Sequence, residues 1–146
     1  NCSLCNEKNI DYINSLWKKL GSKTITMKSK DHDSIMAITS HIPHLIAYNI
    51  VGTASELEED IKSEVIKFCA SGFRDFTRIA SSDPVMWRDI MLSNKEEIIS
   101  LLDKFNNDLR QILDAIKKDD GEFLVKKFQK TREIREKIIE AGLDKN

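Results

Sequence analysis

The feature that most constrains the fold of this chain is its shortage of residues that interrupt helices. Its 146 residues include only 2 prolines and 5 glycines, the two residue types that most strongly break regular structure. With so few of them, we predict long and mostly helical segments, and hence an all-α fold. The length suits one compact domain, or one domain plus a fragment of another.

Composition and charge exclude several classes of protein. Lys and Arg total 23 against 24 Asp and Glu, a formal net charge of −1, whereas nucleic-acid-binding surfaces are usually basic. No apolar stretch approaches the ~20 residues that a membrane-spanning helix needs, and no secretory signal is visible. We therefore expect neither nucleic acid nor a membrane as a partner. Three cysteines fit a reducing cytoplasm better than a disulfide scaffold.

The first 29 residues predict a helix over residues 7–20 that ends at Gly21, followed by a short strand over Lys23–Met27. The strand rests on alternating β-branched residues. A lone strand leaves its backbone hydrogen-bonding groups unmet, so we expect its partner strands upstream. The chain also lacks an initiator Met, which suggests a piece of something longer.

Apolar residues spaced three and four apart predict helices in the next part of the chain. The first begins at Asp31 and contains Pro43, which should kink the helix and loosen the carbonyl of Thr39. The second spans about residues 56–70 and is broken at Ser71-Gly72. A third runs from Pro84 to Met91, with Asp83 as its N-cap.

The C-terminal third predicts a helical hairpin. Capping-box patterns at Ser93-x-x-Glu96 and Asp119-x-x-Glu122 indicate two helix starts, and the last helix should end near Gly142. A coiled-coil-like seam lies on the first of these helices; it consists of Ile98, Leu102, Phe105, Leu109, Ile112 and Ile116. The seam must face the last helix, the kinked helix or another subunit, and the sequence leaves all three open.

The three histidines, His32, His41 and His44, lie close together in the sequence. Ser40 and His44 are four residues apart and share a helix face. A histidine on an apolar helix is most often a satisfied core residue, but two histidines and a serine beside a proline favour a ligand site. Neither His41-x-x-His44 nor Cys2-x-x-Cys5 completes a zinc-site pattern, so we expect no metal.

A second candidate cluster combines Arg74, Asp75 and Arg78, whose spacing puts them on one helix face. Grouped guanidinium groups suit bidentate recognition of carboxylates, with Asp75 able to hold one arginine in place. A solvated ion-pair face is the alternative. The five glycines are too far apart to form a GxGxxG or Walker loop, so we expect no dinucleotide site in this chain.

Three runs of this sequence resemble the C-terminal helical domain of prephenate/arogenate (cyclohexadienyl) dehydrogenases. The runs are HD at His32-Asp33, SHIPH at 40–44, and SGFRDFTRIASSDPVMWRDI at 71–90, which is followed by Asn94. Together they are long and specific, and the resemblance covers nearly the whole chain from Lys23 onward.

The resemblance implies a two-domain enzyme of tyrosine biosynthesis that uses NAD or NADP for the oxidative decarboxylation of prephenate or arogenate. It implies that residues 1–29 are the end of a nucleotide-binding Rossmann domain. Residues 30–146 would be a helical dimerisation and substrate-binding domain, similar to the C-terminal domain of 6-phosphogluconate dehydrogenase, and would form a homodimer. The catalytic histidine and the nucleotide site would lie upstream, so the isolated chain should be inactive.

The resemblance also assigns roles to individual residues. Ser40 and His44 match substrate-contacting positions, and Arg78 matches an arginine that pairs with a substrate carboxylate. Arg74 and Asp75 match positions that reach the neighbouring subunit's site, although the family often has Lys at the former. Trp87 matches a tryptophan near the interface, with a core aromatic as the alternative. A stand-alone helical dimerisation module that binds an aromatic acid without catalysis stays open as a second reading of the whole chain.

Overall fold

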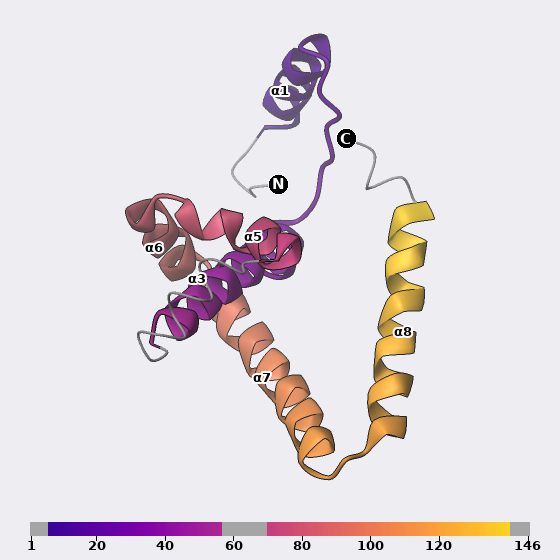
Figure 1. Ribbon diagram of the computed structural model, residues 1–146. Coiled ribbons are helices and arrows are strands. Elements are labelled where there is room, and N and C mark those ends of the chain that lie inside the picture. Colours follow the sequence, from indigo (N-terminus) through magenta and orange to yellow (C-terminus); the bar gives the residue numbers. More distant parts are fainter. Residues whose placement is uncertain (1–5, 57–69, 141–146) are drawn as a thin grey trace. The chain divides into compact units, whose positions relative to one another are not determined.

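The computed structural model describes residues 6–56 and 70–140, and every regular element among them is a helix (Figure 1). The chain divides into two compact units, residues 1–101 and residues 102–146. The all-α prediction is therefore confirmed. In the described part of the chain, no helix is both long and apolar enough to cross a membrane.

Helix α1 (Glu7–Lys19) begins and ends at the residues that its local sequence favours. The Asn6 side chain caps its start by accepting a hydrogen bond from the Lys8 N–H at 3.1 Å. At the other end Gly21 takes a φ of 85°, and the Ser22 and Gly21 N–H groups donate to the carbonyls of Trp17 and Lys18. This pattern is a Schellman motif, so the predicted stop at Gly21 is confirmed.

The predicted strand over Lys23–Met27 is wrong, because the structure has no regular element there. A strand is defined by hydrogen bonds to a neighbouring strand, and the described residues contain no strand that could pair with this segment. Ile25 is accordingly 79% exposed. The segment's β-branched composition is a local preference that needs a partner strand to take effect.

The long helix around Pro43 is confirmed, with an irregularity that differs in form from the one expected. Helix α2 (Ser29–Met36) leads into a π-helical turn, η1 (Ala37–His41), and then into α3 (Ile42–Ser55). In this turn the Ile42 N–H donates to the carbonyl of Ala37, five residues back. Pro43 has no N–H to donate, and the chain accommodates it by widening one turn instead of ending the helix.

The helix predicted over residues 56–70 lies almost entirely outside the described residues. Helix α5 (Ser71–Thr77) begins directly after Ala70, which has an extended backbone, so the break falls just before the predicted Ser71-Gly72. A 3₁₀ turn, η2 (Arg78–Ser81), continues it, and both pack against α3. The Tyr48 hydroxyl on α3 donates to the carbonyl of Ser82 at 2.6 Å.

Helix α6 (Pro84–Ser93) starts as predicted, with the Asp83 carboxylate accepting from the Met86 N–H at 2.7 Å. The core of this first unit is formed by small and apolar residues from η1, α3, α6 and α7: Ala37, Ile42, Ala47, Trp87 and Ile98. The first unit thus places α3 and α6 at a common core, from which the candidate site is built.

Helices α7 (Lys95–Lys117) and α8 (Gly121–Glu140) are confirmed, but both predicted capping boxes are wrong. The Ser93 hydroxyl donates back to the carbonyl of Ile90 at 3.0 Å, and Asn94 links α6 to α7. At α8 the cap is Asp120, which accepts from the Phe123 N–H at 3.0 Å. Asp119 instead takes a φ of 53° in the preceding turn.

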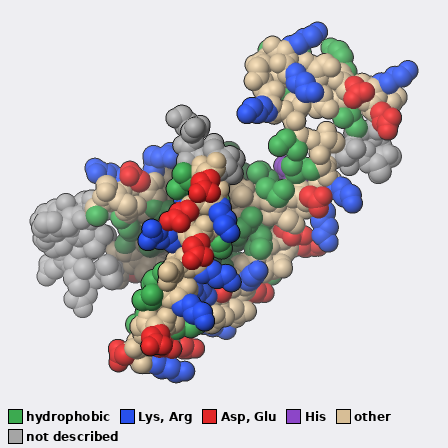
Figure 2. All heavy atoms as spheres, turned by 90° about the vertical axis from the view of Figure 1, so that its right-hand side faces the viewer, with side chains coloured by type: hydrophobic (Ala, Val, Ile, Leu, Met, Phe, Trp, Pro, Cys, Tyr) green, Lys and Arg blue, Asp and Glu red, His purple; other side chains and the backbone are tan. Residues whose placement is uncertain are grey.

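Within the second unit, part of the apolar seam of α7 remains exposed beside α8. The Lys127 ammonium of α8 bonds to the carboxylate of Asp108 at 3.0 Å. Leu109 and Ile116 nevertheless remain 46% and 56% exposed, and several apolar residues of α8 are similarly exposed: Val125, Phe128, Ile134, Ile138 and Ile139. On the face that Figure 2 displays, basic and acidic side chains are interleaved, with apolar side chains between them.

Candidate functional site

The centre of the candidate site is a stacked pair of rings, one from α3 and one from α6. The imidazole of His44 lies on the indole of Trp87 with ring centroids 3.6 Å apart and planes inclined by 22°. Trp87 is buried, at 7% exposure, whereas His44 is half-buried. The core reading of Trp87 is therefore supported, and the stack also gives this residue a direct contact with a predicted ligand-binding histidine.

The backbone of the π turn fixes the proton of His44. The His44 Nδ1 atom lies 2.9 Å from the carbonyl oxygen of Ser40, and a carbonyl can only accept, so Nδ1 must carry a hydrogen. A neutral His44 therefore presents a lone pair at Nε2, and a protonated His44 presents an N–H there. The first form suits a hydroxyl or other donor, and the second suits a carboxylate.

Ser40 and His44 are thus brought together as predicted, through the Ser40 carbonyl. Ser40 is half-buried within the π turn. Single π turns inside helices are frequent at functional sites. The sequence indicated this location only through Pro43, since the register of the turn is not readable from the apolar spacing.

A second histidine, His41, approaches the same tryptophan from the side. Its ring centroid is 6.3 Å from that of Trp87 with planes inclined by 76°. Burial, together with the nearby His32 and His44, holds the pKa of His41 below 6.5, opposed by the charge of Asp33. His41 is therefore a neutral ring that packs edge-to-face in the site.

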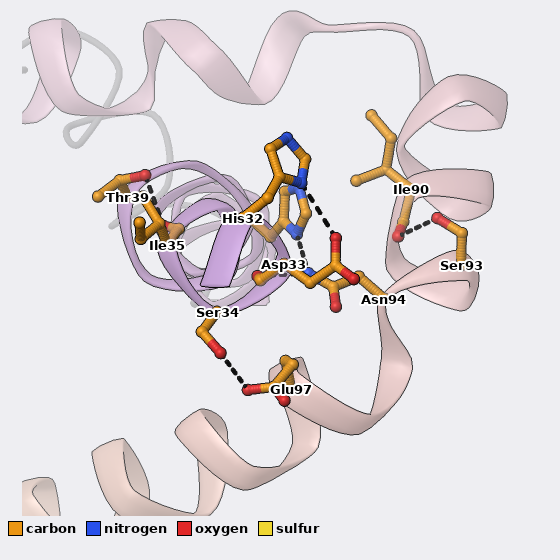
Figure 3. Close-up of polar contacts among 10 residues, drawn as sticks. His32, Asp33, Ser34, Ile35, Thr39, Ile90, Ser93, Asn94 and Glu97 are labelled. Carbon is orange, nitrogen blue, oxygen red and sulfur yellow. Dashed lines mark hydrogen bonds and ion pairs between the residues drawn. The ribbon is translucent and has the colours of Figure 1, made fainter. Parts of the chain in front are cut away.

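Asn94 at the α6–α7 junction connects this cluster to α2. Its side-chain amide donates to the backbone carbonyl of Asp33 at 2.8 Å and lies 3.2 Å from Nδ1 of His41. Figure 3 shows Asn94 facing α2, where the His32 Nδ1 donates to the Asp33 carboxylate at 3.0 Å. One turn further along α7, Glu97 accepts from the Ser34 hydroxyl at 2.8 Å (Figure 3).

Apart from its place after the matching run, no sequence pattern marks Asn94 as a connector. No pattern points to Ser34 or Glu97 either. An asparagine between two predicted helices is ordinarily interpreted as a cap, and only packing shows that this one reaches across to another helix.

The arginine cluster lies at the end of α5 and the start of η2. Arg74, Asp75 and Arg78 are all exposed. In the described part of the chain, no ion pair joins Asp75 to either arginine, and α5 ends at Thr77, so Arg78 belongs to the tighter 3₁₀ turn. Because η2 packs on α3, the segment that carries Arg78 lies beside the helix that carries His44.

Trp87 also lines an apolar hollow between α3 and α6. The cavity measures about 440 Å³, and its wall is mainly apolar, with the Arg88 side chain as its cation. Over residues 6–56 and 70–140, no group of three His, Cys, Asp or Glu side chains could hold a metal ion. Cys2, Cys5 and Cys69 lie outside the described residues.

The described residues do not provide a phosphate cradle for a nicotinamide dinucleotide. Such a cradle is a glycine-rich turn between a strand and a helix. Gly52, Gly72 and Gly121 instead lie within helices or at their first residues.

Comparison with known proteins matches residues 28–130 to the family described as "Prephenate dehydrogenase, dimerization domain". The chain is 37% identical over 126 residues to a cyclohexadienyl dehydrogenase of Zymomonas mobilis, covering 86% of this chain and 43% of that protein. It is 33% identical over 127 residues to a prephenate dehydrogenase of Bacillus subtilis, covering 87% of this chain and 34% of that protein.

A solved structure has the same fold. It is the prephenate dehydrogenase of A. aeolicus in complex with hydroxyphenyl propionate and NAD+, with a TM-score of 0.85 and 30% identity, and the match covers 94% of this chain and 48% of that one. The chain thus spans about half the length, or less, of the proteins that it resembles.

Proposed function

Because the chain belongs to the prephenate dehydrogenase family and contains its dimerization domain, we propose that it is the substrate-binding and dimer-forming part of a prephenate or arogenate dehydrogenase. The full enzyme would oxidise prephenate to 4-hydroxyphenylpyruvate, or arogenate to tyrosine, with NAD or NADP as the hydride acceptor. The observation that carries the proposal is the His44–Trp87 stack within the matching motifs, beside the segment that contains Arg78.

The substrate chemistry agrees with these side chains. Prephenate has two carboxylates, and withdrawing them from water requires charge-assisted donors. Arg78 would supply a planar guanidinium for one of them. His44 could donate to a carboxylate only as an imidazolium, because its Nδ1 hydrogen is already committed to the Ser40 carbonyl. Arg74 and Asp75 would contribute at the neighbouring subunit's site.

The role of this part of the enzyme would be orientation. Loss of CO₂ and formation of an aromatic ring supply much of the driving force, so the protein mainly has to align the substrate with the nicotinamide and assist the hydroxyl proton. The assisting base and the nucleotide site would lie in a Rossmann domain upstream, of which residues 1–29 would be the end. Residues 30–146 would bind substrate and form the homodimer.

The first test is to read the coding DNA immediately upstream of Asn1. We expect an in-frame extension of about 150–170 residues that contains GxGxxG after a strand. The product of the whole reading frame should reduce NAD or NADP when given prephenate or arogenate, and the 146-residue chain alone should not.

A start codon directly before Asn1, or a full-length product that oxidises neither substrate, would overturn the proposal. Calorimetric binding of 4-hydroxyphenylpyruvate by such an inactive protein would instead identify a helical module that recognises an aromatic acid without catalysis.

A further inference from the structure

The side chain of Asn94 is not needed to join α6 to α7, the two helices on either side of it. Its backbone N–H donates to the carbonyl of Ile90 at the end of α6, and its carbonyl accepts from the Ile98 N–H in the first turn of α7. Both helices are therefore joined through the Asn94 backbone. The amide group is left to bond elsewhere, and it is half-buried against α2 and η1.

The Asp33 carbonyl determines which end of the amide faces it. A carbonyl oxygen can only accept, and at 2.8 Å the reverse orientation would place two oxygen acceptors against each other. The NH₂ group of Asn94 must therefore face Asp33. The same nitrogen has a second hydrogen, and it lies 3.2 Å from Nδ1 of His41.

The protonation of His41 follows from this orientation. An amide nitrogen donates and does not accept, so Nδ1 of His41 must be the acceptor and its neutral ring must carry the proton on Nε2. The adjacent His44 has the opposite arrangement, with its hydrogen on Nδ1. The two histidines that contact Trp87 are therefore held in different tautomers.

We propose that Asn94 is a positioning residue, which holds His41 as the neutral Nε2–H tautomer and thereby fixes the rings of His41, Trp87 and His44 in the candidate site. The tautomer assignment stands on geometry alone. Its consequence for substrate binding rests on the proposed function.

The charges around His41 determine how the hydrogen bond between Asn94 and His41 responds to pH. His32 and His44 disfavour protonation of His41, as does burial, whereas Asp33 favours it. A proton on Nδ1 would place one N–H against another at the Asn94 amide. Acid is therefore expected to release this contact before the helices themselves unfold.

Nitrogen-15 NMR of the full chain tests the proposal directly, since two-bond 1H–15N correlations distinguish the two neutral tautomers of histidine. The chain has 3 histidines, which His32→Gln and His44→Gln variants would assign. We expect His41 to show a protonated Nε2 and an unprotonated Nδ1 near pH 7.5. A His41 ring with its hydrogen on Nδ1, or a charged ring at that pH, would overturn the proposal.

Substitutions at Asn94 then test its causal role. Asn94→Ala should leave His41 as a mixture of tautomers. Asn94→Asp should reverse the tautomer and raise the pKa of His41 by about one unit or more, because a carboxylate accepts from Nδ1 and favours the cation. Ser93→Ala is the matched control, since the Ser93 hydroxyl bonds only within the same turn, and it should leave His41 unchanged.

An Asn94→Ala protein with the His41 signals and titration of the wild type contradicts the proposal. If that variant does not fold, the wild-type tautomer and the Asn94→Asp titration decide. In the full-length enzyme, Asn94→Ala should raise the KM for prephenate more than it lowers kcat. Absence of any dehydrogenase activity would count against the proposed function and leave the tautomer result standing.

Discussion

At the scale of single residues, the site is organised by groups that can only accept hydrogen bonds. The carbonyls of Ser40 and Asp33 determine the proton positions of His44 and the orientation of Asn94, and Asn94 in turn determines His41. The two imidazoles next to Trp87 are consequently not interchangeable. His41 is a neutral ring that accepts from Asn94, and His44 donates its Nδ1 hydrogen to the Ser40 carbonyl.

Arg78 gives a direct test of carboxylate recognition in the full-length enzyme. Arg78→Ala should raise the KM for prephenate by one to two orders of magnitude, which corresponds to about 1.5–3 kcal/mol for a charge-assisted hydrogen bond. Steady-state kinetics would measure it. Arg78→Lys should recover part of the loss, since it retains charge without the planar fork.

The matched control for Arg78 is Arg132→Ala. Arg132 is an exposed arginine that pairs with Glu136 on the same helix at 2.9 Å. If both alanine variants change KM equally, or Arg78→Ala leaves KM unchanged, Arg78 has no specific role in binding substrate.

His41 makes stability depend on pH in one direction. Its pKa lies below 6.5 in the folded protein, so the unfolded chain binds this proton more readily. The contribution of neutral His41 is full above about pH 6.5 and is lost as pH falls through the lower folded pKa. Urea unfolding between about pH 8 and pH 5 should show this loss of unfolding free energy.

His41→Gln should flatten that dependence, because glutamine offers Asn94 an acceptor that does not titrate. Ser93→Ala serves as the control, since the Ser93 hydroxyl bonds within its own turn and does not titrate in this range. Parallel pH profiles for wild type and His41→Gln would show that His41 does not cause the acid sensitivity.

At the scale of elements, the helices depend on caps and on one irregular turn. Pro43 is compatible with a continuous helical run because η1 adopts a π register, and the same turn carries Ser40 and His41 into the site. Helix α6 depends on Asp83, whose carboxylate satisfies an N–H group that the first turn leaves unpaired. Loss of this cap should therefore loosen the packing of Trp87, which lies in the first turns of α6.

Asp83→Ala should therefore lower the free energy of unfolding by about 1 kcal/mol, the typical value of an N-cap. Chemical denaturation would measure it, and tryptophan fluorescence would report whether the surroundings of Trp87 loosen. Asp83→Asn should retain most of the stability, since asparagine caps equally well. Asp89→Ala in the same helix should have little effect, because exposed ion pairs contribute little; an equal loss there would refute the cap as the cause.

In the molecule as a whole, many large apolar side chains of the described residues are exposed, and several of them lie on α7 and α8. In the second unit the seam residues Leu109 and Ile116 are half exposed, as is Phe128 on α8. The family match is to a dimerization domain. A second copy would remove these faces from water.

We accordingly predict a dimer at tens of micromolar, measured by light scattering. A Leu109→Glu, Ile116→Glu double variant should shift it to monomer, because each glutamate would place a charge in an apolar contact. Asn107→Glu on the opposite side of α7 is the matched control and should leave the dimer intact. A monomeric wild type, or a double variant that dimerises as tightly, would exclude this face as the interface.

Local sequence patterns are sufficient to predict the described helices, most of their ends and the family. Apolar spacing, the Asp83 cap and Gly21 act within a turn or two of their own position, so they can be recognised without knowing the fold. The long motifs indicate the family for a similar reason, because each is a contiguous run of residues that can be recognised without the fold.

The remaining features depend on contacts between residues that are distant in the sequence. The segment 23–27 has no strand because strand formation needs a partner. Helices α7 and α8 start one residue later than the predicted caps at Ser93 and Asp119 imply, because the interhelix turns set the local geometry. The stack of His44 on Trp87 and the reach of Asn94 to His41 arise from the packing of α6 and α7 against α2, η1 and α3. Short-range periodicity does not show which helix faces pack against each other. That packing brings His41 and His44 together around Trp87 in the candidate site.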